Sequence, residues 1–339
     1  MVVRSMFVAI LITSVLCGHS QKRPLPVIDM HLHALQVKKN EASPVCIGSP
    51  FRDLGLHDPR ENYSEVFQHA LQSNSWADHF IAAPGTNDSL RKLTIASLQK
   101  NNVYAVTSGG IETVRLWKKE AGERILPAIY WDFNSASKEG LTVDSLKRLF
   151  GSGEFRVFGE ITIQYEGYSA SDSAFDPYLA MAEQMDIPIG IHIGPGPPGA
   201  PYLSSTKYRA RLHSPFVLEE ALIRHPKLRV YAMHAGWPML DDMLATLYTH
   251  PQLYVDLAAI CFMIPKKEFY FYLERLVGAG FGKRIMFGSD NMIWPNAIEE
   301  GIKTINEAKF LTPGQKRDIL FNNAVRFLRI PEKELKAMF

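Results

Sequence analysis

Short apolar runs alternate with longer amphipathic segments along most of the chain. Eight of the runs have the length and the β-branched character of buried strands. We expect these strands at residues 27–30, 103–107, 125–130, 157–163, 187–191, 228–233, 253–257 and 285–287. Between them, apolar residues recur at helical spacing in segments that include 89–100, 113–119, 174–185, 215–224, 239–249 and 267–278. The pattern therefore predicts a regular succession of strands and helices.

Such alternation implies a parallel sheet with right-handed crossovers. Eight strand-helix units match a (β/α)8 TIM barrel, which typically needs about 250 residues. A doubly wound open sheet is the alternative, but no glycine-rich dinucleotide fingerprint follows the first strand. We therefore predict an α/β fold of the TIM-barrel class, with residues 21–339 forming one domain.

The connection after the first strand is unusually long and runs from residue 36 to residue 87. In a barrel, the loops that follow strands lie on the face where active sites are built, so we expect this insertion to cap the site. It contains Arg52, Phe67, Trp76 and Phe80. A surface excursion without a role in the site is the other interpretation.

Residues 1–20 have the layout of a secretory signal peptide. Arg4 precedes an uncharged apolar run, and Gly18 and Ser20 supply small residues for cleavage. The run is shorter than the ~18 residues of a spanning helix, so stable membrane insertion is not expected. We expect a secreted or periplasmic protein, in which Cys46 and Cys261 could form one disulfide or stay free.

Net charge narrows the class of partner. The formal charge of +2 and the pI near 8.3 give no strong field, so neither nucleic acid nor an acidic membrane surface is indicated. A small-molecule substrate is the expected partner. The sequence leaves open whether the chain forms a homo-oligomer.

Polar side chains occupy alternate positions of the first predicted strand, in the stretch VIDMHLHAL. Alternation would place Asp29, His31 and His33 together on the inner face and turn the apolar residues between them toward the helices. Buried polar groups are costly unless something satisfies them, and a divalent cation does so directly. Two hydrogen-bonded core histidines are the alternative.

Four further strands end in, or are followed by, a histidine or a carboxylate. These are Glu160 in VFGEITI, His192 in IPIGIHIG, His234 in VYAMHAG and Asp290 in IMFGSDN. In a closed barrel, the carboxyl ends of all strands meet at one mouth. The joint pattern therefore predicts a metal site there.

Imidazole nitrogens and carboxylate oxygens suit zinc, and also manganese, iron or nickel, and the lack of thiolate ligands argues against a closed structural zinc site. We therefore expect a divalent metal cofactor, with zinc as the first choice, in one or two ions. Such an ion would lower the pKa of a bound water to about 7. Asp290 would then be a ligand and the proton acceptor, while His234 would polarise a substrate carbonyl or hold a second metal.

Residues for substrate binding are harder to predict. Arg52, Arg209 and Arg211 are candidates to bind a substrate carboxylate through paired hydrogen bonds, and Trp294 is a candidate to line the pocket. The proline-rich stretch 194–202 could form one wall of it. The remaining histidines have no motif context and are expected at the surface or at helix ends: His57, His69, His79, His213, His225 and His250.

The motifs and their order resemble the amidohydrolase superfamily, and within it the amidohydrolase-related branch. The resemblance rests on DMHLH at 29–33, on His192 and His234, on FGSD ending at Asp290, and on FNNAVRFL at 321–328. It extends over essentially the whole chain after residue 20. It implies a distorted TIM barrel with a metal centre at the C-terminal mouth.

The same resemblance implies roles for individual residues. His31, His33, His192 and Asp290 match the ligand pattern of a single ion, with His234 as an acid, base or electrophilic group. The branch also resembles aminocarboxymuconate semialdehyde decarboxylases and pyrone dicarboxylate lactonases. Family resemblance therefore predicts the site more narrowly than the reaction.

Glu160 leaves a two-ion arrangement open. The stretch FGEI is similar to a strand of TatD-like metal-dependent deoxyribonucleases, and in binuclear relatives a carboxylate of the fourth strand bridges two metals. Near-neutral charge argues against the nuclease activity itself. In this arrangement the first ion is held by His31, His33 and Asp290, the bridge is Glu160, and the second ion is held by His192 and His234. Alternatively, Glu160 is a structural residue that is hydrogen-bonded to His192.

Three functions follow from these interpretations. We expect an amidohydrolase-related, metal-dependent hydrolase that cleaves an ester, lactone or amide bond of a small organic substrate. A metal-dependent non-oxidative decarboxylase is the second hypothesis. A catalytically silent metal-binding barrel is the third.

Overall fold

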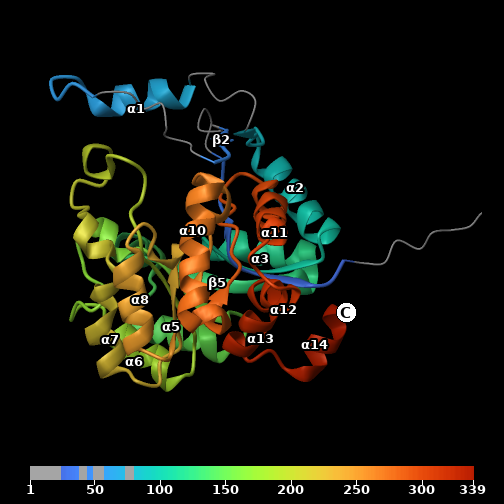
Figure 1. Cartoon of the computed structure of the whole chain (residues 1–339). Coiled ribbons are helices and arrows are strands. Elements are labelled where there is room, and N and C mark those ends of the chain that lie inside the picture. The colour runs from blue at the N-terminus through green and yellow to red at the C-terminus, as the bar shows by residue number, and fades with distance from the viewer. Residues whose placement is uncertain (1–23, 38–43, 49–56, 73–79) are drawn as a thin grey trace, which may run out of the picture.

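The computed structural model describes residues 24–37, 44–48, 57–72 and 80–339. Eight parallel strands pair in chain order (Figure 1), and all eight coincide with predicted strands. They are β1 (Val27–Ala34), β4 (Val103–Gly109), β5 (Ile125–Trp131), β6 (Val157–Ile161), β7 (Ile189–His192), β8 (Val230–Met233), β9 (Leu253–Asp256) and β10 (Ile285–Met286). The predicted (β/α)8 TIM barrel is confirmed.

Backbone hydrogen bonds nearly close the sheet. The N–H of Met30 donates to the carbonyl of Phe287 at 2.9 Å, and the N–H of His33 donates to the carbonyl of Asn291 at 3.1 Å. These bonds join β1 to the segment that follows β10. The first and last ligand motifs of the sequence therefore lie side by side in space.

Helices surround the barrel and connect its strands. They are α1 (Tyr63–Gln72), α2 (Asn87–Lys100), α3 (Ile111–Ala121), α4 (Phe133–Glu139), α5 (Val143–Gly151), α6 (Asp176–Gln184), α7 (Glu219–Arg224), α8 (Leu240–Thr249), α9 (Ile260–Met263), α10 (Lys266–Leu276), α11 (Ala297–Glu307), α12 (Pro313–Arg317), α13 (Asn323–Leu328) and α14 (Glu332–Met338). Threonine caps begin several of them: Thr86 accepts a hydrogen bond from the N–H of Ser89, and Thr312 forms a capping box with Gln315.

The interior of the barrel contains large apolar side chains below the mouth. The Tyr231 hydroxyl on β8 donates to the carbonyl of Met30 on β1 at 3.1 Å, which is possible only across the interior. Tyr231 needs a residue without a side chain opposite it, because a Cβ on Gly190 would lie 2.4 Å from its ring. Phe321 and Phe327, from the C-terminal helical segment, belong to the same cluster and cover the end opposite the mouth.

The first strand does not keep strict alternation. Ile28 and Met30 pack in the inner cluster with Tyr231, whereas Leu32 packs with the helices. A bulge between Asp29 and Leu32 shifts the register against β4 by one residue. The expectation that Ile28 and Met30 face the helices is therefore wrong, and Asp29 lies on the strand face opposite to them.

Asp29 connects the two ends of the sheet. Its Oδ1 accepts hydrogen bonds from the N–H of His31 at 3.0 Å and from the N–H of Ser289 at 2.9 Å. The side chain is completely buried. Burial raises its pKa from 3.8 to about 6, although the bonds from Ser289 and His31 oppose this shift.

The long insertion after β1 is described in part. Strands β2 (Val45–Cys46) and β3 (Phe80–Ile81) pair antiparallel, and α1 lies above the barrel in Figure 1. The Tyr63 hydroxyl of α1 donates to the carbonyl of Pro198 at 3.0 Å. The insertion thus contacts the loop that follows β7, and its role as a cap stays a prediction.

The structure bears only in part on the export and redox predictions. Residues 1–20 lie outside the described segments, so the signal peptide stays a prediction. Within those segments, no helix is long and apolar enough to cross a bilayer. Cys261 is a buried free thiol that donates to the carbonyl of Gly288 at 3.5 Å.

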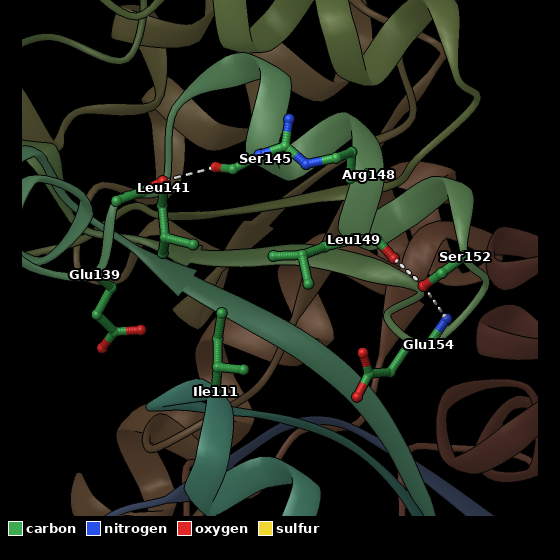
Figure 2. A pocket seen from close by; sticks show the side chains of 9 residues that line it. Ile111, Glu139, Leu141, Ser145, Arg148, Leu149, Ser152 and Glu154 are labelled. Carbon is green, nitrogen blue, oxygen red and sulfur yellow. Dashed lines mark hydrogen bonds between the residues drawn. The ribbon is translucent and has the colours of Figure 1, made fainter.

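A groove of about 370 Å³ lies on the helical layer between α3 and α5 (Figure 2). Its lining is mixed, with apolar, hydroxyl and charged side chains: Ile111, Glu139, Leu141, Ser145, Arg148, Leu149, Ser152 and Glu154. None of the predicted ligands lines it. The groove is therefore separate from the chemistry at the mouth.

Replacing Asp29 with asparagine tests the effect of the buried Asp29 carboxyl on stability. Asparagine keeps an acceptor oxygen for His31 and Ser289 but cannot ionise. Ionisation of the Asp29 carboxyl is harder in the folded state than in the unfolded state. The free energy of unfolding of the wild type therefore falls by roughly 3 kcal/mol as pH rises from about 3.8 to about 6. Urea unfolding of metal-free protein should show Asp29→Asn gaining stability over wild type as pH rises from 4.5 to 7. A difference that does not vary with pH would contradict this prediction.

Candidate metal centre

The six predicted ligands meet at the C-terminal mouth of the barrel. Their relative exposures lie between 2% for His31 and 8% for His234. His31 and His33 come from β1, Glu160 from β6 and His192 from β7. His234 follows β8, and Asp290 follows the last strand. The strand ends thus bring together side chains that are far apart in the sequence.

His31, His33 and Asp290 form one group, and Glu160 approaches it. The Nε2 atoms of His31 and His33 are 3.1 Å apart. Asp290 Oδ1 lies 3.7 Å from His31 Nε2 and 3.1 Å from His33 Nε2. Glu160 Oε2 approaches the same two nitrogens at 3.6 and 3.3 Å. Two imidazoles and two carboxylates therefore surround one point.

The other two histidines form a second group. His192 Nδ1 and His234 Nε2 are 3.1 Å apart. Glu160 Oε1 lies 2.6 Å from His192 Nδ1 and 3.7 Å from His234 Nε2. The two oxygens of Glu160 thus face different pairs of imidazoles. The arrangement can hold two cations, with this carboxylate between them.

The remaining ring nitrogen of each histidine has a polar neighbour. Such neighbours fix the tautomer and the orientation of a metal-binding imidazole. The pairs are His31 Nδ1 with Asp256 Oδ2 at 3.3 Å, His33 Nδ1 with Ser108 Oγ at 3.2 Å, His234 Nδ1 with the Ala258 carbonyl at 3.0 Å, and His192 Nε2 with the Tyr165 hydroxyl at 3.4 Å. In its neutral form, with the proton on the outer nitrogen, each imidazole would present one lone pair to the centre of the site.

Two of the ligands sit on left-handed backbone. The φ angles of His234 and Asp290 are 59° and 50°. Residues other than glycine rarely adopt this conformation, which favours a functional reason for it. Asp256 Oδ1 supports the turn at His234 by accepting from the N–H of His234 at 2.8 Å and of Ala258 at 3.1 Å. The strand ends are thus bent to aim these side chains inward.

The histidines and carboxylates of the site shift one another's pKa values. Burial alone would lower the pKa of His31, but the carboxylates of Asp290 and Glu160 outweigh it and hold the pKa well above its usual range. The pKa of His33 is raised to about 9 against the same burial penalty. Burial would raise the pKa of Glu160, yet the positive charge on His31 and the imidazole hydrogen bonds hold it well below its usual range. Protons balance the buried carboxylates here, and metal cations can replace them.

Hydrogen bonds join several of the donor atoms, but one carboxylate oxygen is left without one. Asp290 Oδ1 is buried and makes no hydrogen bond within the described residues, although His33 Nε2 lies 3.1 Å away. A short contact without hydrogen-bond geometry is expected of two atoms that face a shared cation. Nitrogen and oxygen donors without sulfur match zinc, manganese, iron or nickel. The residues present therefore fit a divalent metal.

The predicted substrate-binding residues are less clearly placed. Arg52 lies outside the described segments. Arg209 is exposed and donates to the carbonyls of Thr206 and Tyr208. Arg211 is also exposed. Trp294 is partly buried, and its backbone N–H donates to Asn291 Oδ1 at 2.7 Å. Their roles in substrate binding stay predictions.

Three side chains near His192 were not predicted from the sequence. Gln164 Nε2 donates to the His192 carbonyl at 2.7 Å, and Tyr165 and His213 pack edge-on against the His192 ring at 5.2 and 5.3 Å. Burial, and then the neighbouring His192 imidazole, lower the pKa of His213 to about 3, so it stays neutral. Only the short spacing of Gln164 and Tyr165 from Glu160 could have drawn attention to them.

The surface or helix-end position expected for the other histidines holds for His225 and His250, which are the C-cap residues of α7 and α8, but three of these histidines are buried. His213 is completely buried, and His225 and His250 are 6% and 5% exposed. His225 and His250 contact carboxylates of neighbouring helices, so they are structural. His79 lies outside the described segments.

Comparison with known proteins shows the family of the chain. The amidohydrolase family model matches residues 28–330. No curated protein matches the sequence. A probable 2-pyrone-4,6-dicarboxylic acid hydrolase from Acinetobacter baumannii is similar in structure, with 13% identity and a TM-score of 0.57 over 90% of this chain and 100% of the other.

Two further solved structures show the range of chemistry on this fold. One is 4-oxalomesaconate hydratase from Rhodopseudomonas palustris, with 14% identity and a TM-score of 0.54 over 92% of this chain and 98% of the other. The other is 5-carboxyvanillate decarboxylase from Novosphingobium aromaticivorans, complexed with manganese, with 11% identity and a TM-score of 0.54 over 91% and 97%. At these identities the likeness shows the fold alone. The family model extends over the whole barrel and all six converging ligands, and the chain belongs to the amidohydrolase family.

Proposed function

We propose that the protein is a metal-dependent hydrolase that uses two divalent ions to cleave an ester, lactone or amide bond of a small organic substrate. The observation that carries the proposal is the position of Glu160. Its Oε2 faces His31 and His33, while its Oε1 faces His192 and His234. A single carboxylate placed between two imidazole pairs suits a bridge between two ions.

Each ligand then has an assigned place. In the first site His31, His33 and Asp290 would hold one ion, and in the second site His192 and His234 would hold the other. The 3.1 Å between His234 Nε2 and His192 Nδ1 favours a ligand role for His234 over contact with a substrate carbonyl. Zinc is the first choice of metal, and manganese, iron or nickel are the others.

The chemistry follows from the ions and from the residues around them. A bound divalent ion supplies Lewis acidity, which lowers the pKa of water and polarises a carbonyl oxygen. Asp290 would accept the proton from the attacking water. Asp256 lies 3.3 Å from His31 Nδ1 and supports the turn that carries His234.

A decarboxylase is the second candidate. Structures similar to this one include 5-carboxyvanillate decarboxylase complexed with manganese and 2,6-dihydroxybenzoate decarboxylase. Among the described residues, however, no arginine or lysine contacts a predicted ligand, which gives little support for binding an aromatic carboxylate. We therefore place hydrolysis first.

Removing the negative charge of Glu160 should leave the protein with one bound ion instead of two. Glu160→Gln keeps the size of the side chain but not a carboxylate that can bridge. Reconstituted wild type should contain two zinc equivalents per chain by elemental analysis after dialysis, and the variant should contain one. Glu139→Gln, at an exposed position of the groove in Figure 2, is the matched control and should keep two. Equal metal content in all three proteins would contradict the bridging role.

Activity assays distinguish the two reactions. Zinc-loaded wild type should hydrolyse members of a panel of aryl esters, lactones and amides, and it should release no carbon dioxide from aromatic acids. His31→Ala and Asp290→Ala should each reduce kcat/KM by at least about a thousandfold, because each removes a ligand of the first ion. Circular dichroism checks that both variants are folded. Carbon dioxide release without hydrolysis would favour the decarboxylase.

A further inference from the structure

Strand β6 and the segment that follows it contact His192 at three points. Glu160, on β6 itself, lies 2.6 Å from Nδ1 of the ring. Gln164 and Tyr165 belong to a short helical turn, Ile163–Glu166, that follows the strand. Gln164 holds the His192 carbonyl at 2.7 Å, and the Tyr165 hydroxyl lies 3.4 Å from Nε2. One piece of chain thus contacts both ring nitrogens and the backbone of this ligand.

We propose that Tyr165 is a positioning residue that sets the affinity of the second metal site by fixing the tautomer of His192. This inference rests on the proposed two-ion function. Tyr165 itself binds no ion. It acts on the metal only through the imidazole of His192.

The tautomer argument starts from the ring nitrogen that faces the site. His192 Nδ1 lies 2.6 Å from Glu160 Oε1 and 3.1 Å from His234 Nε2, so Nδ1 is the nitrogen that faces the second ion. A neutral imidazole has one lone pair and one N–H. Nδ1 can therefore bind a cation only when the proton is on Nε2, where the Tyr165 hydroxyl accepts it. Without this acceptor, the N–H of a buried ring loses its hydrogen bond.

The four imidazoles differ in the strength of this support. His31 Nδ1 lies 3.3 Å from the carboxylate of Asp256 without hydrogen-bond geometry, and His234 Nδ1 lies 3.0 Å from a backbone carbonyl. His192 has a neutral hydroxyl at 3.4 Å, the longest of the four contacts. The first site also has the carboxylate of Asp290. His33 in the first site also has a neutral hydroxyl, Ser108 Oγ at 3.2 Å, so the second site differs by its longer contact and by having no carboxylate of its own besides Glu160.

The loop after β7 fixes the position of the hydroxyl. A Cβ on Gly196 would lie 2.1 Å from the Tyr165 hydroxyl, so this glycine is needed for the close approach. Tyr208 packs at 5.3 Å from the Tyr165 ring and accepts a hydrogen bond from the N–H of Gly196 at 2.9 Å. His213 packs edge-on at 5.2 Å. The hydroxyl is thus held between the loop and the ligand.

The test is a zinc titration of metal-free Tyr165→Phe against a chromophoric chelator. Phenylalanine keeps the ring packing and removes only the hydroxyl. The Kd of the second zinc equivalent should rise about 10- to 100-fold, the usual effect of losing such a partner, while the first stays within about twofold. Tyr130→Phe is the matched control: its hydroxyl bonds to Thr162 and Asp132, not to a ligand, so both equivalents should bind as in wild type.

Gly196→Ala is an independent second variant. The added methyl group would displace the Tyr165 hydroxyl and leave the phenol present. It should weaken the second equivalent in the same direction, with the thermal unfolding of metal-free protein close to wild type. A purely structural role for Tyr165 would instead lower the unfolding temperature and weaken both equivalents together.

The possible outcomes separate this inference from the proposed function. If wild type binds two equivalents and Tyr165→Phe leaves the second unchanged, the positioning role is wrong and the two-ion hydrolase stands. Equal weakening of both equivalents would also overturn the positioning role. If wild type binds only one equivalent, the two-ion function itself fails.

Discussion

Carboxylates and imidazoles buried together at the mouth of the barrel are the constraint on which the rest of the structure depends. Glu160 and Asp290 lie among four histidines with little access to water. Buried charges of this kind are costly unless cations compensate them. Protons can do so, as the raised pKa values of His31 and His33 show, but a shared divalent ion also satisfies atoms that have no hydrogen bond.

The surrounding scaffold serves to hold these charged groups in place. The bulge in β1 lets apolar residues fill the interior below the mouth while the histidines of the same strand reach the ligand centre. Asp29 fastens β1 to the segment before Asp290, and Asp256 contacts His31 and the turn at His234. The polar atoms around the four histidines thus favour one orientation of each ring.

The repeating pattern and the strand-end motifs predicted much of this from the sequence. The eight strands and the meeting of His31, Glu160 and Asp290 follow from periodicity and from barrel geometry. The bulge was missed because alternation in VIDMHLHAL looks regular, although the register against β4 is not. Tyr165 was missed because its importance comes from a short helical turn that has no sequence motif. The substrate stays a proposal, since Arg52 lies outside the described residues and Arg209 and Arg211 are exposed.

The most direct test of the central claim is a crystal structure of the zinc-loaded protein with anomalous data collected on both sides of the zinc edge. The account predicts two zinc peaks, one on each side of the Glu160 carboxylate, the first near His31 and His33 and the second near His192 and His234. A single peak at full occupancy, with Glu160 only hydrogen-bonded to His192, would contradict it.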